Sequence, residues 1–401
     1  MNHKIGRRFF LTSALFIALT QLLSGCSNSV KSLKILLLED SIPPQLIEDF
    51  RKAIGRGSNI DFKANTQLFE ILDWLKKWQK SPDSIQETNF LSRILGRATN
   101  NSISLATLGD AWLQTAITQK LIQPLTIDWL DGWEKLPISW QQLVKRNDRG
   151  ELDSNGQIWG APYRWGSVVI AYRSDKLASL GWTPTDWEDL WREDIRDRLS
   201  LLNSPREIIG LTLKKLGYSY NTKDLTSVSN LEPELLALHR QAKLYSSDHY
   251  LQPLILGDTW IAVGWSTDII PITERRSNIK FAIPKSGTSL WADVWVQPQL
   301  PAALASDSET GVNNNGLSEL ITEWISFCWK PKAAQQISLF TSGASPMLWN
   351  TKPEELPKNL QKNRFLSSEA LVSEKSEFLL PLDAKTQEQY KSLWLKIRQE
   401  A

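Results

Sequence analysis

Tryptophan close to a carboxylate is the pattern in this sequence that could do chemistry. The chain holds 19 tryptophans, and two of them stand near an acid beside predicted strands. Trp265 precedes Asp268, and Trp291 precedes Asp293, while a further acid, Glu207, stands at the start of a predicted helix. Aromatic faces attract cations through the ring quadrupole, and carboxylates neutralise them. The combination is typical of a desolvated site for an organic ammonium group.

The same residue types allow other interpretations. Indole rings could stack on a sugar, and most of the tryptophans are expected to pack in the core. Glu207 and Asp293 could be the acid/base pair of an exported hydrolase, but such a pair must face one bond at a fixed separation. The sequence contains no HExxH, no glycine-rich phosphate loop, no GxSxG and no paired CxxC. We therefore predict a binding protein, not an enzyme, and predict no cofactor and no metal.

Alternating strands and helices must position these residues. In the first part of the chain, strands are predicted at 33–38, 59–62 and 103–108, and helices at 44–54 and 68–78. This order implies a parallel or mixed sheet covered by helices. In such sheets, ligands lie at the carboxyl ends of strands, in the loops that lead into helices.

A second set of elements begins near Trp159. Its predicted strands and helices are 166–172, 186–191, 208–216, 261–263, 279–283 and 291–296. The strand 261–263 leads directly to Trp265, and the strand 291–296 carries Trp291 and Asp293. The candidate residues are therefore expected at or near strand ends.

The N-terminus predicts export. A basic start with Arg7 and Arg8 leads into an apolar stretch that is shorter than the roughly 20 residues needed to cross a bilayer. We predict a signal peptide over 1–25 that ends in a lipobox, lipidation of Cys26, and a short tether over 26–32. The paired arginines are compatible with either the Sec or the twin-arginine route. The mature protein is then expected in the periplasm, anchored to the membrane by its lipid.

Length and composition limit the number of domains and the classes of partner and metal site. The 401 residues exceed one ordinary domain, so two or three are expected. Lys plus Arg is 46 and Asp plus Glu is 44, a balance that argues against a basic nucleic-acid binder. Two cysteines and three histidines provide little for metal clusters or disulfides. Cys328 lies in an apolar run and is expected to be a buried, inert thiol.

Motifs spread over most of the mature chain carry a family resemblance. They are LLLEDSIPPQLIEDF at 36–50, GQIWGAPYRWGSVVIAYRSDKL at 156–177, SPREIIGLTLKKLGYSYNT at 204–222 and IKFAIPKSGTSLWADVWVQP at 279–298. Through these motifs the chain resembles the extracytoplasmic solute-binding proteins of ABC importers, and among them the spermidine/putrescine-binding branch.

The resemblance implies an α/β fold of two lobes, the type II periplasmic-binding-protein fold. Each lobe would be a mixed sheet flanked by helices, and crossover strands would join the lobes. We expect the first lobe to comprise 33–139 plus 292–347, and the second to comprise 140–291 plus 348–401. Hinge closure would let both lobes grip one small ligand.

The family's pocket residues match four positions of this chain. The resemblance implies that Asp293 neutralises a primary ammonium group and that Glu207 neutralises another charged nitrogen. The indoles of Trp265 and Trp291 would then sandwich the methylene chain between them.

Other pocket positions depart from the family pattern. Ser204 stands where the family has a second acid. Leu38 and Ser41 replace the aromatic residues of the first loop, while Glu39 and Asp40 bring acids that could substitute. Further on, Ala111 and Gly343 fall near positions where the family has tyrosines, and Asp110 lies beside the first of them.

These matches and departures lead to a functional prediction. We expect a monomeric, lipid-tethered protein that binds a polyamine or other organic cation between its lobes and serves an ABC permease. The alternative is the same fold with a sugar or an amino-acid derivative as ligand.

Overall fold

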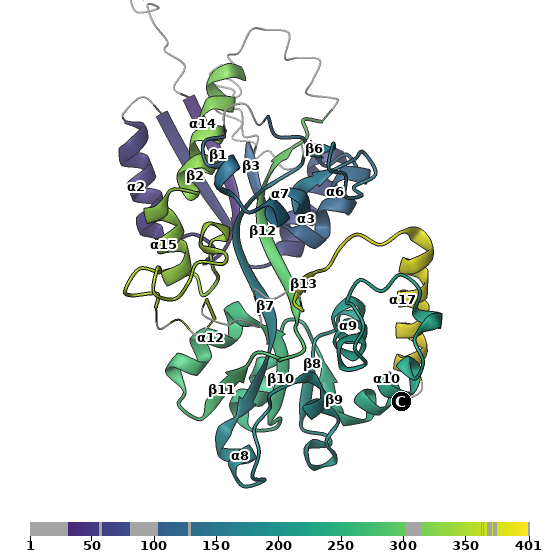
Figure 1. The fold of residues 1–401 in the computed structure, drawn as a ribbon. Coiled ribbons are helices and arrows are strands. Elements are labelled where there is room, and N and C mark those ends of the chain that lie inside the picture. The colour runs from purple at the N-terminus through teal and green to yellow at the C-terminus, as the bar shows by residue number, and fades with distance from the viewer. Residues whose placement is uncertain are drawn as a thin grey trace, which may run out of the picture.

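The computed structural model describes residues 31–55, 58–80, 103–126, 130–301 and 314–399, with short gaps at 362, 364, 367–370 and 372–374. The predicted signal peptide, the lipobox with Cys26 and most of the tether therefore lie outside the described residues. Figure 1 shows two lobes, one above the other, that are connected by the long strands β7 (Ala161–Arg173) and β12 (Ser289–Pro298).

One mixed sheet runs through both lobes in the order β2-β1-β3-β12-β7-β10-β8-β9. Its other strands are β1 (Lys31–Leu38), β2 (Ser58–Asn65), β3 (Leu105–Gly109), β8 (Leu199–Leu201), β9 (Ala242–Tyr245) and β10 (Ile261–Trp265). β1 is parallel to β2 and β3, whereas β12 is antiparallel to both β3 and β7. The predicted mixed sheet and α/β class are confirmed.

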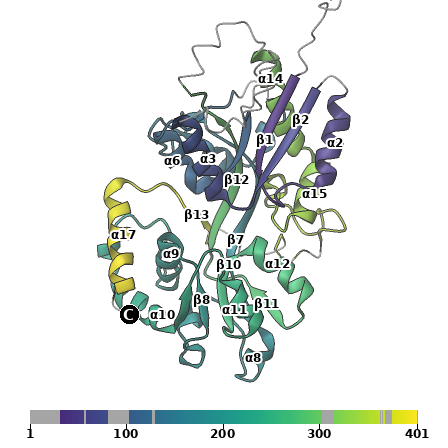
Figure 2. The same cartoon turned by 180° about the vertical axis from the view of Figure 1, so that it is seen from behind.

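Helices cover the sheet of each lobe. In the first lobe, the larger helices are α2 (Pro44–Ile54), α3 (Leu68–Lys80), α14 (Asn314–Cys328) and α15 (Pro331–Phe340). In the second lobe they are α9 (Pro205–Lys215), α10 (Leu231–Gln241), α12 (Ser266–Arg275) and α17 (Ala384–Gln399). Seen from behind in Figure 2, the C-terminal helix α17 lies beside α9 and α10. The last segment of the chain thus completes the second lobe.

Local sequence explains where several of these elements begin and end. Buried leucine and isoleucine residues fill β1, because helices cover both faces of its sheet. Proline stands at the first position of α2 and of α9, where its missing N–H is harmless. α9 is followed by Gly217 with φ +82°, the left-handed conformation that glycine adopts readily.

The division between the two hydrophobic cores differs from the expected domain boundaries. The first core contains buried residues of 140–165 and of the described part of 348–371, which we expected in the second lobe. Aromatic packing is the reason. Trp165 contacts Trp349 at a centroid distance of 4.7 Å and Phe365 at 5.1 Å. Trp140 packs edge-on against Trp349 at 5.4 Å, so the late segment folds back onto the first lobe.

Candidate ligand-binding site

A cavity of about 760 Å³ lies between the lobes. This is within the usual range of roughly 300–1,000 Å³ for small-molecule sites. Its lining comes from both hydrophobic cores, with Leu68 and Leu290 from the first and Leu379 and Leu382 from the second. A ligand in this cavity would contact both lobes at once.

Five of the six predicted ligand residues line this cavity, namely Asp110, Glu207, Trp265, Trp291 and Asp293. Glu39 does not line it, because its side chain is exposed on the turn after β1. In that turn, Asp40 has a left-handed φ of 57°. The acids expected to substitute in the first loop therefore do not reach the cavity.

Asp110 stands directly after β3, at the carboxyl end of a strand, where ligands of such sheets bind. Its Oδ1 accepts a hydrogen bond of 2.9 Å from the backbone N–H of Ala292. Its Oδ2 is buried without a hydrogen-bond partner among the described residues. Burial raises the pKa of Asp110 to about 6.

Asp293 lies on β12, and the backbone register sets it opposite Gly109 of β3 and Arg164 of β7. Arg164 donates a hydrogen bond from Nε to Oδ2 of Asp293 at 2.7 Å, and its Nη2 forms a salt bridge with the same oxygen at 2.6 Å. The Oδ1 atom of Asp293 is buried and has no such partner in the described part of the chain. Burial raises the pKa of Asp293, and the Arg164 guanidinium opposes that rise.

Glu207 lies in the first turn of α9 and is buried. The hydroxyl of Ser289 on β12 donates a hydrogen bond to its Oε2. Burial raises the pKa of Glu207 to about 7, because the charged form loses its hydration.

The two predicted indoles occupy strand ends on either side of the lobe boundary. Trp265 is the last residue of β10, and its backbone N–H donates to the Tyr250 hydroxyl at 3.0 Å. Trp291 lies opposite Gly166 in the register of β12 with β7. A Cβ at Gly166 would lie 2.2 Å from Cζ2 of Trp291, so glycine leaves the space that the indole fills.

Sequence reasoning missed the arginines of this cavity, which are Arg146, Arg164 and Arg206. Arg146 donates to backbone carbonyls, including that of Leu143 at 3.0 Å. Arg206 donates to the Leu380 carbonyl at 3.2 Å and to the Asn221 side chain at 3.0 Å. Arg164 alone forms a salt bridge with a predicted ligand residue. A signal was present, since Arg164 interrupts the otherwise apolar and aromatic run at the start of β7.

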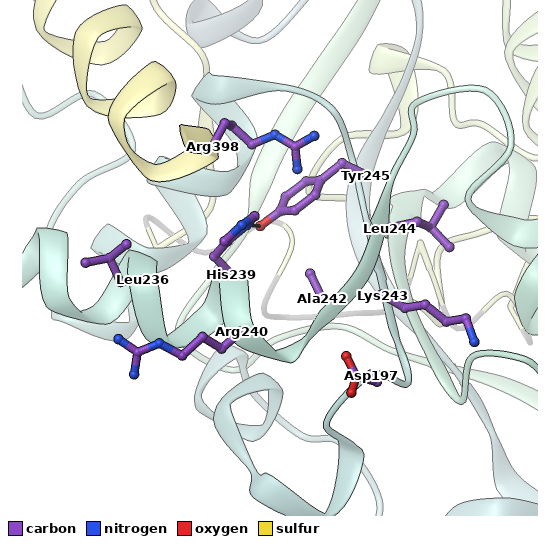
Figure 3. Close-up of a pocket in the computed structure, with 9 residues that line it drawn as sticks. All are labelled: Asp197, Leu236, His239, Arg240, Ala242, Lys243, Leu244, Tyr245 and Arg398. Carbon is purple, nitrogen blue, oxygen red and sulfur yellow. Dashed lines mark hydrogen bonds between the residues drawn. The ribbon is translucent and has the colours of Figure 1, made fainter. Parts of the chain in front are cut away.

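A second pocket of about 460 Å³ lies on the second lobe and contains no predicted ligand residue. Figure 3 shows the side chains of Arg240 and Lys243 extending away from one another. His239 bonds to the Tyr245 hydroxyl through Nδ1 at 3.0 Å, and the Arg398 guanidinium lies 4.1 Å from the Tyr245 ring centroid. These contacts give His239 a packing role near the end of α10 (Leu231–Gln241).

Two further findings concern metals and membranes. In the described ranges, no three His, Cys, Asp or Glu residues gather as a metal site would require. No helix in those ranges has both the length and the apolar character needed to span a bilayer. Cys328 is buried and free, as predicted, and burial raises the pKa of its thiol.

The sequence of this chain is similar to those of known solute-binding proteins. Residues 103–368 match the family of bacterial extracellular solute-binding proteins. The chain is 29% identical over 157 residues to the putrescine/cadaverine-binding protein of Pseudomonas aeruginosa, covering 36% of this chain and 44% of that one. It is 26% identical over 180 residues to the spermidine/putrescine-binding periplasmic protein of Salmonella typhimurium, covering 45% and 47%. The chain therefore spans less than half the length of these two relatives.

Solved structures extend the likeness to the whole fold. The spermidine/putrescine substrate-binding protein PotD of Streptococcus pneumoniae matches with a TM-score of 0.71 and 20% identity, over 92% of this chain and 99% of that one. A protein of Listeria monocytogenes described as a spermidine/putrescine ABC transporter matches with a TM-score of 0.64, also at 20% identity, over 92% and 100%. These likenesses confirm the predicted two-lobed binding-protein fold.

Proposed function

The chain belongs to the bacterial extracellular solute-binding proteins, and from that premise we propose that it binds a small organic cation of the amine class in the cavity between its lobes. The carboxylates of Asp110 and Asp293 carry this proposal. Each is buried in the cavity lining, and each has one oxygen without a hydrogen-bond partner among the described residues. An ammonium group supplies both the donors and the positive charge that these oxygens lack.

The aromatic lining supports the same ligand class. Trp265 and Trp291 line the cavity together with the two carboxylates, and indole faces attract organic cations. Several similar proteins are named for putrescine, cadaverine or spermidine. We further propose that the protein acts in the periplasm as a monomer anchored through Cys26, and that it delivers its ligand to an ABC permease without transforming it.

Calorimetric titration of the purified protein at pH 8 tests the ligand class. The panel should contain monoamines, amino alcohols, putrescine and spermidine, with sugars and amino acids as the competing classes. At least one member of the first group is expected to release or absorb heat, to change tryptophan fluorescence and to raise the melting temperature. At 100 times its Kd, such a ligand adds roughly 2.7 kcal/mol to the free energy of unfolding.

A pair of variants links binding to the cavity. Asp110→Asn keeps the side-chain shape and the acceptor for Ala292 but removes the charge, so it should weaken cation binding by more than about tenfold. Glu39→Gln removes an exposed carboxylate outside the cavity and should leave the Kd unchanged. Binding of a sugar or an amino acid, with no response to any amine or amino alcohol, would overturn the proposal.

A further inference from the structure

We propose that Arg164 is a specificity-determining residue that fills one ammonium position of the cavity, so that the pocket accepts ligands with a single ammonium group and disfavours diamines. This inference rests on the proposed function and refines its ligand class. Arg164 forms its salt bridge with Asp293 at 2.6 Å, and the exposed fractions of the two side chains are 5% and 1%. A charge so deeply buried and so well paired is a fixed part of the cavity lining.

The guanidinium contacts two residues to which the family resemblance assigns the ligand, Asp293 and Trp291. Its Cζ atom lies 5.7 Å from the ring centroid of Trp291, within range of a cation–π interaction. It also pairs with Oδ2 of Asp293 through a hydrogen bond from Nε and a salt bridge from Nη2. The carboxylate and the indole expected to hold an ammonium group thus already hold a protein cation.

The surrounding chain is shaped to keep Arg164 there. A Cβ at Gly343 would lie 2.7 Å from Cγ and 3.0 Å from Cδ of Arg164, so a larger residue at 343 would displace the arginine stem. The backbone carbonyl of Thr341 accepts a long hydrogen bond of 3.5 Å from Nη1. The late segment of the first lobe therefore provides both the space and an acceptor for this side chain.

A donor group and a free acceptor meet at Asp293. The guanidinium of Arg164 carries only donors, whereas Oδ1 of Asp293 has no hydrogen-bond partner among the described residues. An ammonium group that donates to this oxygen would face the Arg164 charge. A hydroxyl group can accept a hydrogen bond and brings no charge.

The charges beside Asp293 point the same way. Arg164 already balances the charge of Asp293, and Arg146 interacts electrostatically with Asp110. Among the other lining residues, Glu207 interacts electrostatically with Arg206, and Asp268 accepts a hydrogen bond from the Tyr250 hydroxyl at 2.8 Å. A second ammonium group near Asp293 would be desolvated beside a guanidinium, which is unfavourable.

Putrescine and 4-aminobutan-1-ol form a matched pair of probes, because they differ only in one ammonium group against one hydroxyl. Titrated at pH 8 into the wild-type protein, the amino alcohol should bind at least about tenfold more tightly than putrescine. Putrescine binding more tightly by the same margin would overturn the inference and leave the proposed function standing. If neither probe binds, nor any other amine, both proposals fail together.

Variants of Arg164 assign the preference to this side chain. Arg164→Gln frees Asp293 for a second ammonium group and should shift the preference toward putrescine by at least about tenfold, whereas Arg164→Lys should keep the wild-type preference. Arg192→Gln is the control. Arg192 also pairs with an aspartate, Asp194, at 3.1 Å and lies 4.2 Å from the ring centroid of Trp182, but it does not line the cavity. If folded Arg164→Gln keeps the wild-type ratio of the Kd values for putrescine and 4-aminobutan-1-ol, the inference is overturned. If this variant does not fold, the ratio measured for the wild-type protein still tests the inference.

Discussion

Glu207 illustrates how the burial of an acid in the cavity lining makes the stability of the fold depend on pH. Its carboxyl group lies in the first turn of α9 with one hydroxyl partner, Ser289. Burial raises its pKa to about 7 from an ordinary value of 4.5. The unfolded chain therefore releases this proton at a lower pH than the folded chain does. Between these two pKa values the folded state holds more proton, so rising pH destabilises it through this group.

At the residue scale, we expect Glu207→Gln to reduce this pH dependence. The wild type should lose about 3 kcal/mol of unfolding free energy through this one group as pH rises from 4.5 to 7, and the variant should not. Urea denaturation of both proteins at pH 5 and pH 8 measures the difference. Glu188→Gln changes an exposed acid and is the control. Its free energy of unfolding should differ from that of the wild type by the same amount at both pH values. Equal pH dependence in the wild type and Glu207→Gln would contradict the assignment.

At the scale of elements, the pairing of β7 with β12 sets two contacts of the site. The register sets Arg164 opposite Asp293 and Gly166 opposite Trp291. Both cross-strand pairs need close approach, one for hydrogen bonding and the other for the indole that covers the glycine. A register shift of one residue would turn these side chains to the opposite face of the sheet.

We expect Gly166→Ala to displace the indole of Trp291 and to destabilise the fold by about 1–3 kcal/mol, since the new methyl group would overlap Cζ2. The smaller ring of Trp291→Phe should remove much of this overlap. A double-mutant cycle measured by urea denaturation should then give a cost for Gly166→Ala that is smaller in the Trp291→Phe background. Additive effects of the two substitutions would contradict this packing.

On the scale of the whole molecule, β7 and β12 cross between the lobes of Figure 1, and the cavity takes its lining from both. A ligand that contacts both lobes stabilises their closed arrangement by its differential affinity for that state. Attachment to a membrane would keep the protein close to its proposed permease. That attachment depends on Cys26, which lies outside the described residues.

We expect the protein produced in a bacterial host to incorporate labelled fatty acid and to sediment with membranes, and Cys26→Ser to abolish both. If the predicted lipobox is used, the acyl chains are attached to Cys26, so the substitution removes the site of lipidation. Cys328→Ser is the control, since Cys328 is buried in the first core and should not affect the label. Unchanged labelling of Cys26→Ser would show that the predicted lipobox is not used.

Local pattern was enough to determine the elements and the family. Apolar periodicity located β1, α2 and α3, because the period of burial follows directly from the geometry of strands and helices. The resemblance to the family implied that Glu207, Trp265, Trp291 and Asp293 share a site, and all four line one cavity. Local periodicity by itself does not specify which strand ends and helix starts meet in the fold.

The tertiary structure alone decided the partner of Asp293 and the boundaries of the cores. Arg164 and Asp293 are 129 positions apart, and no local period specifies which side chains meet across β7 and β12. Likewise, Trp349 joins the first core because it packs against Trp165, a contact between distant segments. Such pairings depend on strand register and on the complementary shape of packed side chains, which exist only once the chain has folded.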